Sequence, residues 1–265
     1  MKRMTRLSQW CSLALLSVLL VAVNAASAAD VRVVSSGGFA AAYRLLGPEH
    51  ERRSGDRLVT AWGPSMGQTP EAIPNRMARG EPIDVVIMVD GALNALIKQG
   101  KVVPASKRIL AASKIAMAVR GGAAKPDIST VDALRQTLLN AKSIAYSDSA
   151  SGVYLSSVLF PRLGIADQIK GKSRMIPAEP VGQVIARGDA EIGFQQLSEL
   201  LPVAGLEIVG LLPGDAQTVT LFSAGVVTDS KEARAARALV EFLASPAAAA
   251  AIGQTGLEPG SNAKH

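Results

Sequence analysis

The stretch that decides the fold is YSDSASGVY, residues 146–154. Residues 142–146 read as a short buried strand, and the apolar spacing of residues 153–160 predicts a helix directly after the turn. Free backbone N–H groups and the positive end of the helix dipole make such a turn a ready site for an anion. The simpler alternative is that Ser149 or Ser151 only caps the helix.

Two earlier segments repeat this order of strand, Ser/Gly turn and helix. The first covers residues 31–53, with the turn SSGG at 35–38, and the second covers residues 58–79, with the turn GPSMGQ at 63–68. Such a repeated alternation is typical of an α/β fold with parallel strands. In these sheets the ligand lies beyond the carboxyl ends of the strands, where all three turns fall.

The rest of the chain extends this alternation. Residues 82–90 form a nearly all-apolar run, as expected for a parallel strand covered on both faces. Further strands are expected at 115–119, 190–194, 206–211 and 219–227, and further helices at 131–140, 180–188, 195–199 and 231–243. The order predicts two α/β lobes joined by crossing strands, with a ligand between them. Lobe 1 would comprise residues 30–116 and 222–265, and lobe 2 residues 117–221.

Residues 1–29 have the pattern of a secretory signal peptide. Lys2, Arg3 and Arg6 precede an apolar run at 13–23, and small residues follow at 26–29. The run is too short to span a membrane. We therefore expect cleavage near residue 28 or 29, a periplasmic location and no membrane span in the mature chain. The only cysteine lies in this peptide, so the mature chain has no disulfide or thiol chemistry.

Composition excludes several classes of function. The formal net charge is +6, of which the signal peptide carries three cations, leaving about +3 on the mature chain. No stripe of basic residues accompanies that charge, so nucleic acid is not an expected partner. The two histidines, His50 and His265, give no credible metal-ligand cluster, and no metal is expected. A small anion is compatible with this weakly basic chain.

The order of these features resembles the molybdate-type periplasmic binding proteins, which have the type II solute-binding fold, over essentially the whole mature chain. The matching segments are 35–36, the turn at Ser65, 80–87 with Asp90, 149–154, 180–181 and 191–194. That family holds an oxyanion with serine hydroxyls and backbone N–H groups. The resemblance therefore implicates Ser36, Ser65, Ser151 and Val181 as ligand contacts.

Two departures from the molybdate pattern point to a larger ligand. Gln195-Gln196 stands where molybdate binders usually place a tyrosine, and the stretch from Ser65 to Arg76 is longer, adding Gln68, Asn75 and Arg76. A compact tetrahedral oxyanion needs no arginine or additional amides. A polycarboxylate does, because each carboxylate is best held by a planar fork or by several fixed donors.

Three strings resemble one subgroup with this fold, the aconitate isomerases. They are SSGGFAAAY at 35–43, residues 146–154 and FQQLSELL at 194–201. The resemblance implies interconversion of trans-aconitate and cis-aconitate by an allylic proton shift, without a cofactor. That chemistry needs carboxylate clamps, a base for a methylene proton and a donor at the other end of the allylic system.

Candidate roles follow from the turns and from the resemblance. Asp148 and Tyr154 are the candidate catalytic residues, although Asp148 is also suited to an Asx turn and Tyr154 to the core. Arg76 is a candidate carboxylate clamp or, alternatively, a surface charge. Glu199 and Gln196 are plausible contacts on the lid side. The candidate substrate-binding residues are Ser35, Ser36, Gly37, Ser65, Met66, Arg76, Ser149, Ser151, Gly152, Val181 and Gln196.

Two functions without turnover stay open. The chain could be the periplasmic binding protein of an ABC transporter for molybdate or another small anion or carboxylate, which the fold alone would favour. It could also be a binding subunit for signalling. Binding requires complementarity to the ground state, whereas catalysis also requires a positioned proton acceptor.

Overall fold

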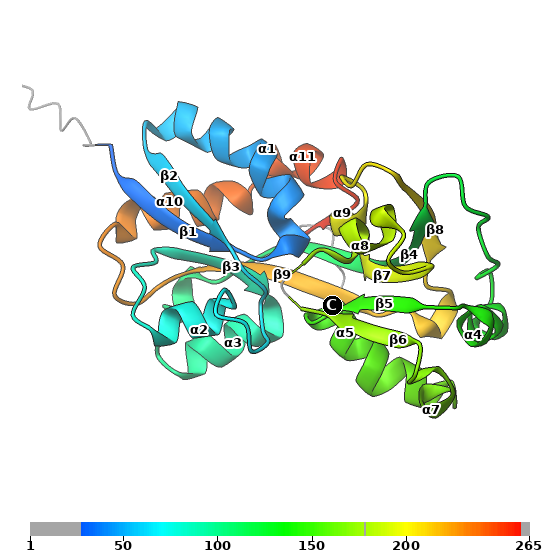
Figure 1. Cartoon of the computed structure of the whole chain (residues 1–265). Coiled ribbons are helices and arrows are strands. Elements are labelled where there is room, and N and C mark those ends of the chain that lie inside the picture. The colour runs from blue at the N-terminus through cyan, green and yellow to red at the C-terminus, as the bar shows by residue number, and fades with distance from the viewer. Residues whose placement is uncertain (1–27, 178, 261–265) are drawn as a thin grey trace, which may run out of the picture.

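The computed structural model describes residues 28–177 and 179–260. The predicted signal peptide therefore lies outside the described residues, except for Ala28 and Ala29. Figure 1 shows two lobes, each with helices packed against part of one sheet. The predicted α/β, two-lobed fold is thus confirmed, whereas the predicted limits of the lobes, 30–116 with 222–265 and 117–221, stay a prediction.

The sheet has ten strands in the order β2-β1-β3-β9-β4-β7-β5-β6, and β8 and β10 pair with β4 outside this path. The strands are β1 (Asp30–Ser35), β2 (Arg57–Trp62), β3 (Val85–Val89), β4 (Arg108–Arg120), β5 (Ile144–Ser147), β6 (Ser173–Ile176), β7 (Ile192–Gln196), β8 (Leu206–Leu211), β9 (Val219–Val226) and β10 (Glu258–Pro259).

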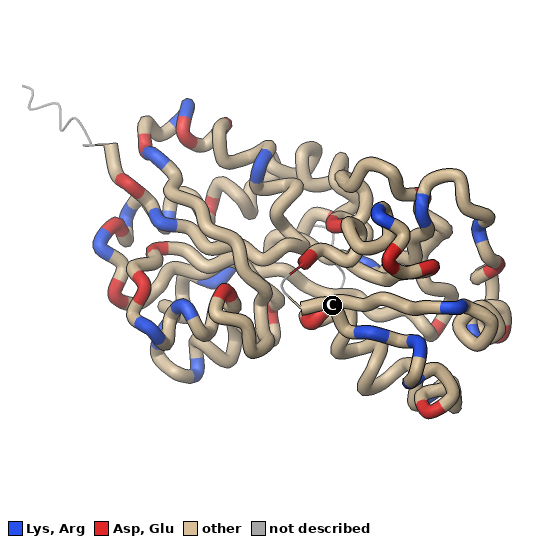
Figure 2. Tube along the Cα trace, viewed as in Figure 1, with Lys and Arg blue, Asp and Glu red and all other residues tan. Residues whose placement is uncertain are grey.

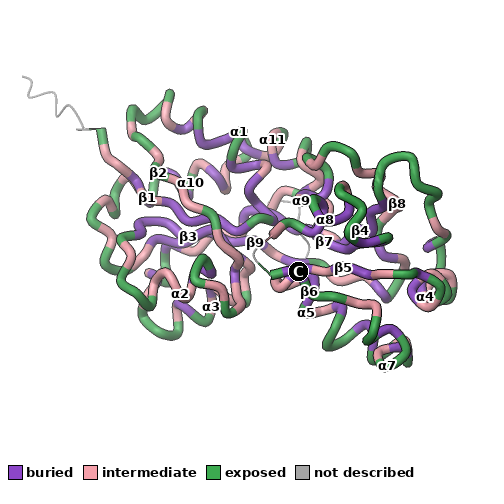
Figure 3. The backbone as a smooth tube through the Cα atoms, viewed as in Figure 1, coloured by how far each residue is buried: buried purple, intermediate pink, exposed green. Residues whose placement is uncertain are grey.

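The helices cover both faces of this sheet. They are α1 (Gly37–Ser54), α2 (Ile73–Ala78), α3 (Asp90–Lys98), α4 (Val131–Asn140), α5 (Ala150–Tyr154), α6 (Phe160–Arg162), α7 (Ala166–Ile169), α8 (Val181–Arg187), α9 (Leu197–Leu200), α10 (Ala233–Leu243) and α11 (Ala249–Gly253). A π-helical turn, Leu155–Leu159, joins α5 to α6. Figure 3 shows the central strands buried beneath exposed outer helical faces.

The sheet is mixed rather than wholly parallel. β1 pairs in parallel with β2 and β3, and β5 pairs in parallel with β6 and β7, as the alternation predicts. However, β9 is antiparallel to β3 and β4, and β4 is antiparallel to β7. The reason is that β4 and β9 carry the chain between the lobes in opposite directions.

β4 belongs to both lobes. Its residues 108–114 pair with β9, and residues 115–120 pair with β7 and β8. Each lobe has apolar clusters of its own. One cluster of lobe 1 packs α1 and α10 on β1, β3 and β9, and one cluster of lobe 2 packs α4 and the helices after β5 on β4 and β7.

The segment of Gln195 and Gln196 differs from its prediction. Both residues end the buried strand β7, and the helix α9 begins only at Leu197. The prediction of a helix from residue 195 is therefore wrong. Pairing of Gln196 with Ile115 and Gln195 with Ala116 in β4 extends the strand through both amides.

Within residues 28–177 and 179–260, no single helix is long and apolar enough to cross a membrane. One bent pair, α10 with Pro246–Gly253, meets the length and composition criteria jointly.

Candidate functional site

A cleft of about 520 Å³ lies where the carboxyl ends of strands from both lobes meet. β1, β2 and β3 lead into it from lobe 1, and β5 and β7 from lobe 2. The lining residues are Ser36, Gly37, Gly38, Trp62, Gly63, Pro64, Glu71, Val89, Ser147, Asp148, Ser149, Ala150, Ser151, Glu179, Pro180, Gln195, Gln196, Glu199 and Phe222. The position is the one that parallel α/β sheets use for ligands.

The lobe 1 wall contains an unsatisfied hydroxyl at the N-terminus of α1. Ser36 is the N-cap residue of this 18-residue helix, yet its side chain makes no capping hydrogen bond. Its Oγ is buried, with the residue 3% exposed, and has no partner among the described residues. A buried hydroxyl without a partner is costly, so one on a cleft-lining residue at a helix N-terminus indicates a ligand position.

The backbone at this helix start is closely packed. A Cβ at Gly38 would overlap the Phe222 ring, and a Cβ at Gly37 would overlap the Glu199 carboxylate. Ser198 Oγ also donates to the Gly38 carbonyl at 2.7 Å. The start of α1 is thereby fixed against α9, although α9 follows β7 of lobe 2.

The turn 146–154 forms the lobe 2 wall. Ser149 is the N-cap residue of α5 but makes no side-chain capping bond, so simple capping does not explain it. The hydroxyls of Ser147 and Ser151 lie 3.0 Å apart. A Cβ at Gly152 would overlap the Ser147 carbonyl, so only glycine allows this tight entry into the helix. Hydroxyls from this turn and from α1 thus face one cleft.

A carboxylate, Glu199, lies at the floor of the cleft. Gln195 Nε2 donates to Glu199 Oε1 at 2.9 Å, and Gln195 Oε1 accepts from the Gly182 N–H at the start of α8 at 3.4 Å. Burial raises the pKa of Glu199 from 4.5 to about 7, and the negative charge of Asp148 adds to that rise. Hydrogen bonds from Gln195 and from the Gln196 backbone oppose the pKa rise only in part.

Gln196 supplies a second unsatisfied group. Its Nε2 donates to Thr220 Oγ1 at 2.9 Å, but its Oε1 is buried without a partner among the described residues. The residue is 2% exposed and lines the cleft. Ser36 and Gln196 thus each have one buried polar atom without a partner among the described residues, and both residues line the same cleft.

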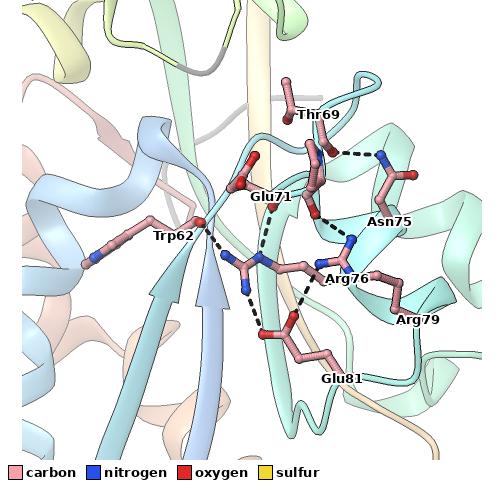
Figure 4. A network of polar contacts seen from close by, with 8 residues as sticks. Trp62, Thr69, Glu71, Asn75, Arg76, Arg79 and Glu81 are labelled. Carbon is pink, nitrogen blue, oxygen red and sulfur yellow. Dashed lines mark hydrogen bonds and ion pairs between the residues drawn. The ribbon is translucent and has the colours of Figure 1, made fainter.

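Arg76 does not line the cleft. It holds the loop between β2 and α2, which contributes lining residues, by hydrogen bonds and an ion pair (Figure 4). Its Nη1 pairs with Glu81 Oε1 at 2.6 Å, its Nε donates to the Glu71 carbonyl at 3.0 Å, and its Nη2 donates to the Trp62 carbonyl at 3.3 Å. The guanidinium group is thus engaged just behind Trp62 and Glu71, which do line the cleft.

Several other sequence-predicted residues also lie outside the lining. Ser65 is buried, and its Oγ accepts from the Val89 N–H at 2.9 Å. The Ser35 hydroxyl bonds the Ser36 carbonyl at 3.2 Å. Tyr154 donates to the Ala216 carbonyl at 3.0 Å and packs on the lobe 2 core. Those outside the lining are Ser35, Ser65, Met66, Arg76, Gly152, Tyr154 and Val181; those lining it are Ser36, Gly37, Asp148, Ser149, Ser151 and Gln196.

Among the described residues, the lining of the cleft contains carboxylates but neither Lys nor Arg. Asp148, Glu71, Glu179 and Glu199 line it, and Glu179 pairs with Arg187. Figure 2 shows Lys and Arg spread over both lobes without a basic stripe. Within residues 28–177 and 179–260 no group of three His, Cys, Asp or Glu residues is placed to hold a metal ion. An anion would therefore meet hydroxyls and amides rather than cations.

Sequence reasoning missed three lining residues in particular, Trp62, Glu179 and Phe222, and it named Gln195 only as a departure from the molybdate pattern. It also left Ser147 out of the binding set and did not consider Glu199 as a base. The signal for Glu199 was present, because this carboxylate follows Gln195 by four residues, close to the end of a predicted strand. Phe222 carried none, because a buried aromatic in a strand looks like core.

The chain matches the model of the bacterial extracellular solute-binding protein family over residues 31–258 and belongs to that family. Solved structures support the fold. The Azotobacter vinelandii periplasmic molybdate-binding protein superposes with a TM-score of 0.69 at 22% identity, covering 86% of this chain and 98% of that one. The sulfate-binding protein SubI of Mycobacterium tuberculosis gives 0.67 at 20% identity, covering 88% and 87%.

Within the family, the chain is similar to proteins of two kinds. It is 56% identical over 227 residues to an aconitate isomerase of a Pseudomonas species, covering 86% of this chain and 87% of that protein. It is 27% identical over 253 residues to the molybdate-binding protein ModA of Azotobacter vinelandii, covering 89% and 95%.

Proposed function

We propose that this chain is an exported aconitate isomerase, which interconverts trans-aconitate and cis-aconitate by an allylic proton shift in the cleft between its lobes. The similarity to the Pseudomonas enzyme supports this function over nearly the whole chain. The extracellular family supports a periplasmic location after signal cleavage near residue 28 or 29. No cofactor is part of the proposal.

The observation that carries the proposal is the combination of groups in one cleft. The Ser36 hydroxyl and the Gln196 amide oxygen are buried without a partner among the described residues, and both residues line the same cleft as the carboxylate residue Glu199. A protein that only stores or delivers an anion gains nothing from a buried carboxylate beside its ligand, because the two negative charges repel. A proton shift, in contrast, requires a group that accepts and returns a proton.

In this proposal the substrate carboxylates are held by hydroxyl and backbone N–H groups from both lobes. Ser36 and Gly37 at the start of α1 line the same cleft as Ser149 and Ser151 at the start of α5, and Gln196 also lines it. The same donors would stabilise the enolate-like charge that develops when the methylene proton leaves. Asp148 stays a candidate catalytic residue. Tyr154 and Arg76 are proposed not to contact the substrate but to hold neighbouring segments in place.

A second function has a specific observation in its favour. The similarity to ModA over most of both chains supports a transport receptor for molybdate or another small anion. Under that reading an ABC transporter would be the partner. The acid-rich lining without Lys or Arg fits a compact dianion less well than a substrate whose carboxyl groups exchange protons with the site.

The test is turnover by the purified mature protein. Incubation with trans-aconitate, without added metal or cofactor, should produce cis-aconitate. Ultraviolet absorbance and chromatography measure the conversion. Thermal-shift titrations with molybdate, tungstate and citrate run in parallel. A melting shift with molybdate together with no conversion of trans-aconitate would favour the transport receptor instead.

A further inference from the structure

We propose that Glu199 is the catalytic residue that carries the migrating proton, and that Gln195 is a positioning residue that holds it. This inference rests on the proposed isomerase function and assigns a step to a particular side chain. It differs from the sequence-based expectation, in which Asp148 was the preferred base.

The position of Glu199 supports the assignment. Its carboxylate projects into the cleft while contacting the backbone of Gly37 at the start of α1, where a Cβ would overlap Oε1. The anion-holding N-terminus of α1 and the proposed base therefore lie in direct contact. A substrate carboxylate bound at Ser36 brings its neighbouring carbon atoms close to Glu199.

The support of Glu199 is unusually well defined for a cleft side chain. Gln195 bridges it to α8, accepting from the Gly182 N–H at 3.4 Å and donating to Glu199 Oε1 at 2.9 Å. Gln195 itself is buried in β7. One carboxylate oxygen is thus occupied, so Glu199 is oriented by groups that do not move with the ligand, as precise proton transfer requires.

The ionisation of Glu199 fits both halves of the reaction. Burial and the negative charge of Asp148 raise its pKa to about 7, so it is both a stronger base than an ordinary carboxylate and readily reprotonated near neutral pH. The other carboxylates that line the cleft are Glu71 and Glu179, and Glu179 is paired with Arg187. Asp148 is the neighbouring residue whose charge acts on Glu199.

The proposed step balances without a co-reactant. The Glu199 carboxylate removes a proton from the substrate methylene group, so a C–H bond breaks and an O–H bond forms. The released electron pair forms the new C=C bond, and the electrons of the old one move onto a substrate carboxylate as an enolate. The Glu199 carboxyl group then returns a proton to the far carbon of the allylic system. Glu199 ends as a carboxylate again.

The experiment compares Glu199→Gln with Glu241→Gln, which removes the same charge from α10 outside the cleft lining. The glutamine at 199 keeps an acceptor for Gln195, so the fold is retained. We expect kcat to fall at least about 100-fold in Glu199→Gln, since positioned acid–base groups contribute about 10²–10⁴-fold. Binding of trans-aconitate, measured by calorimetry, should persist, and Glu241→Gln should match the wild type.

The pH profile of Gln195→Ala tests the positioning role. The wild-type kcat/KM should rise with pH through about 7, because Glu199 must lose its proton to act as a base. Loss of the Gln195 hydrogen bond, which lowers that pKa, should move the midpoint to higher pH. A merely structural residue would lower activity without moving the midpoint.

The outcomes separate the two claims. If the wild type converts trans-aconitate and Glu199→Gln does so within a few-fold of its rate, the assignment to Glu199 is overturned while the isomerase function stands. An unshifted profile in Gln195→Ala overturns the positioning role. If the wild type binds trans-aconitate without converting it, the isomerase function and this inference both fail.

Discussion

Ser36 is the side chain that best separates a role in ligand binding from a role in fold stability, because its buried hydroxyl has no partner among the described residues. We predict that Ser36→Ala weakens trans-aconitate binding about 10- to 100-fold, the loss of a hydrogen bond to a charged group. The melting temperature without ligand should stay the same or rise, since an unsatisfied group is removed. Calorimetric titration and thermal melting measure the two effects.

Ser106 is the matched control for that change. It is also buried, but its Oγ donates to the Val103 carbonyl at 2.6 Å and accepts from the Val226 N–H at 2.8 Å. Ser106→Ala should therefore cost about 1–3 kcal/mol of stability and leave affinity unchanged. Equal stability losses in both variants would show that Ser36 is a structural cap.

Glu199 gives a pH signature in stability as well as in activity. Its pKa is raised from 4.5 to about 7 in the folded state, so the folded protein holds a proton that the unfolded chain has released between these values. Its stabilising contribution is therefore fully present below about 4.5 and is lost as the pH rises through about 7. Without ligand, the melting temperature of the wild type minus that of Glu199→Gln should decrease as the pH rises from about 4.5 through about 7. A constant difference from pH 4.5 to 8 would contradict the raised pKa.

Sequence patterns located the turns better than the individual contacts. Ser36, Ser149 and Ser151 line the cleft because the turn between a parallel strand and the next helix is placed there by topology. Ser65 follows β2 in the same way, but its hydroxyl is taken by the Val89 N–H. Tyr154 lies one helical turn beyond Ser151 and points to the lobe 2 core instead. Which face a side chain presents depends on packing that no local pattern specifies.

Among the elements, the loop between β2 and α2 depends on Arg76. Its guanidinium contacts Glu81, the Glu71 carbonyl and the Trp62 carbonyl (Figure 4). We predict that Arg76→Ala lowers the free energy of unfolding by about 2 kcal/mol, the scale of hydrogen bonds to a charged group, and also weakens ligand binding because the lining loop loosens. Chemical denaturation and calorimetry measure the two effects.

Arg79, the C-cap residue of α2, is the control for the Arg76 variant, because Arg76 lies in the last turn of the same helix. It donates to the Pro70 carbonyl at 2.7 Å, and its side chain is 50% exposed, compared with 17% for Arg76. Arg79→Ala should cost under about 1 kcal/mol. An Arg76→Ala variant that lost affinity at full stability would instead indicate a direct carboxylate clamp, the role expected from the sequence.

Helices and strands were predictable where apolar residues recur at a regular spacing. They were less predictable in the strands that run from one lobe to the other. The helix over 131–140 matches α4 in both limits. In contrast, β4 begins at Arg108, seven residues before the predicted strand, because Ser113 and Lys114 interrupt its apolar run. β7 extends through two glutamines whose strand conformation is imposed by pairing with β4.

At the scale of the whole molecule, the cleft walls belong to different lobes that β4 and β9 connect (Figure 1). Binding a polycarboxylate between Ser36 and Ser151 should draw the walls together, since donors on both must reach the same ligand. We predict a smaller radius of gyration in small-angle scattering on addition of trans-aconitate. Glu199→Gln should compact equally, because it still binds. An unchanged scattering curve at saturating ligand would contradict closure.

The fold also explains how a binding protein could acquire turnover. Serine hydroxyls and helix N-termini lie beyond the carboxyl ends of strands in this cleft, an arrangement that suits an oxyanion. In this chain β7 ends in Gln195-Gln196 and leads directly into Glu199, so a supported carboxylate joins those donors at the cleft floor. One short segment would then convert complementarity for an anion into complementarity for a proton-transfer transition state.

The measurement that tests the central claim most directly is proton NMR of trans-aconitate with the purified mature protein in deuterated water. The isomerase function predicts that trans-aconitate signals decay while cis-aconitate signals appear. The carbon that receives the proton carries deuterium only in the fraction of turnovers in which the Glu199 carboxyl group exchanges with solvent before returning its proton. Unchanged trans-aconitate signals under saturating conditions, together with a melting shift on adding molybdate, would contradict it and identify a receptor without turnover.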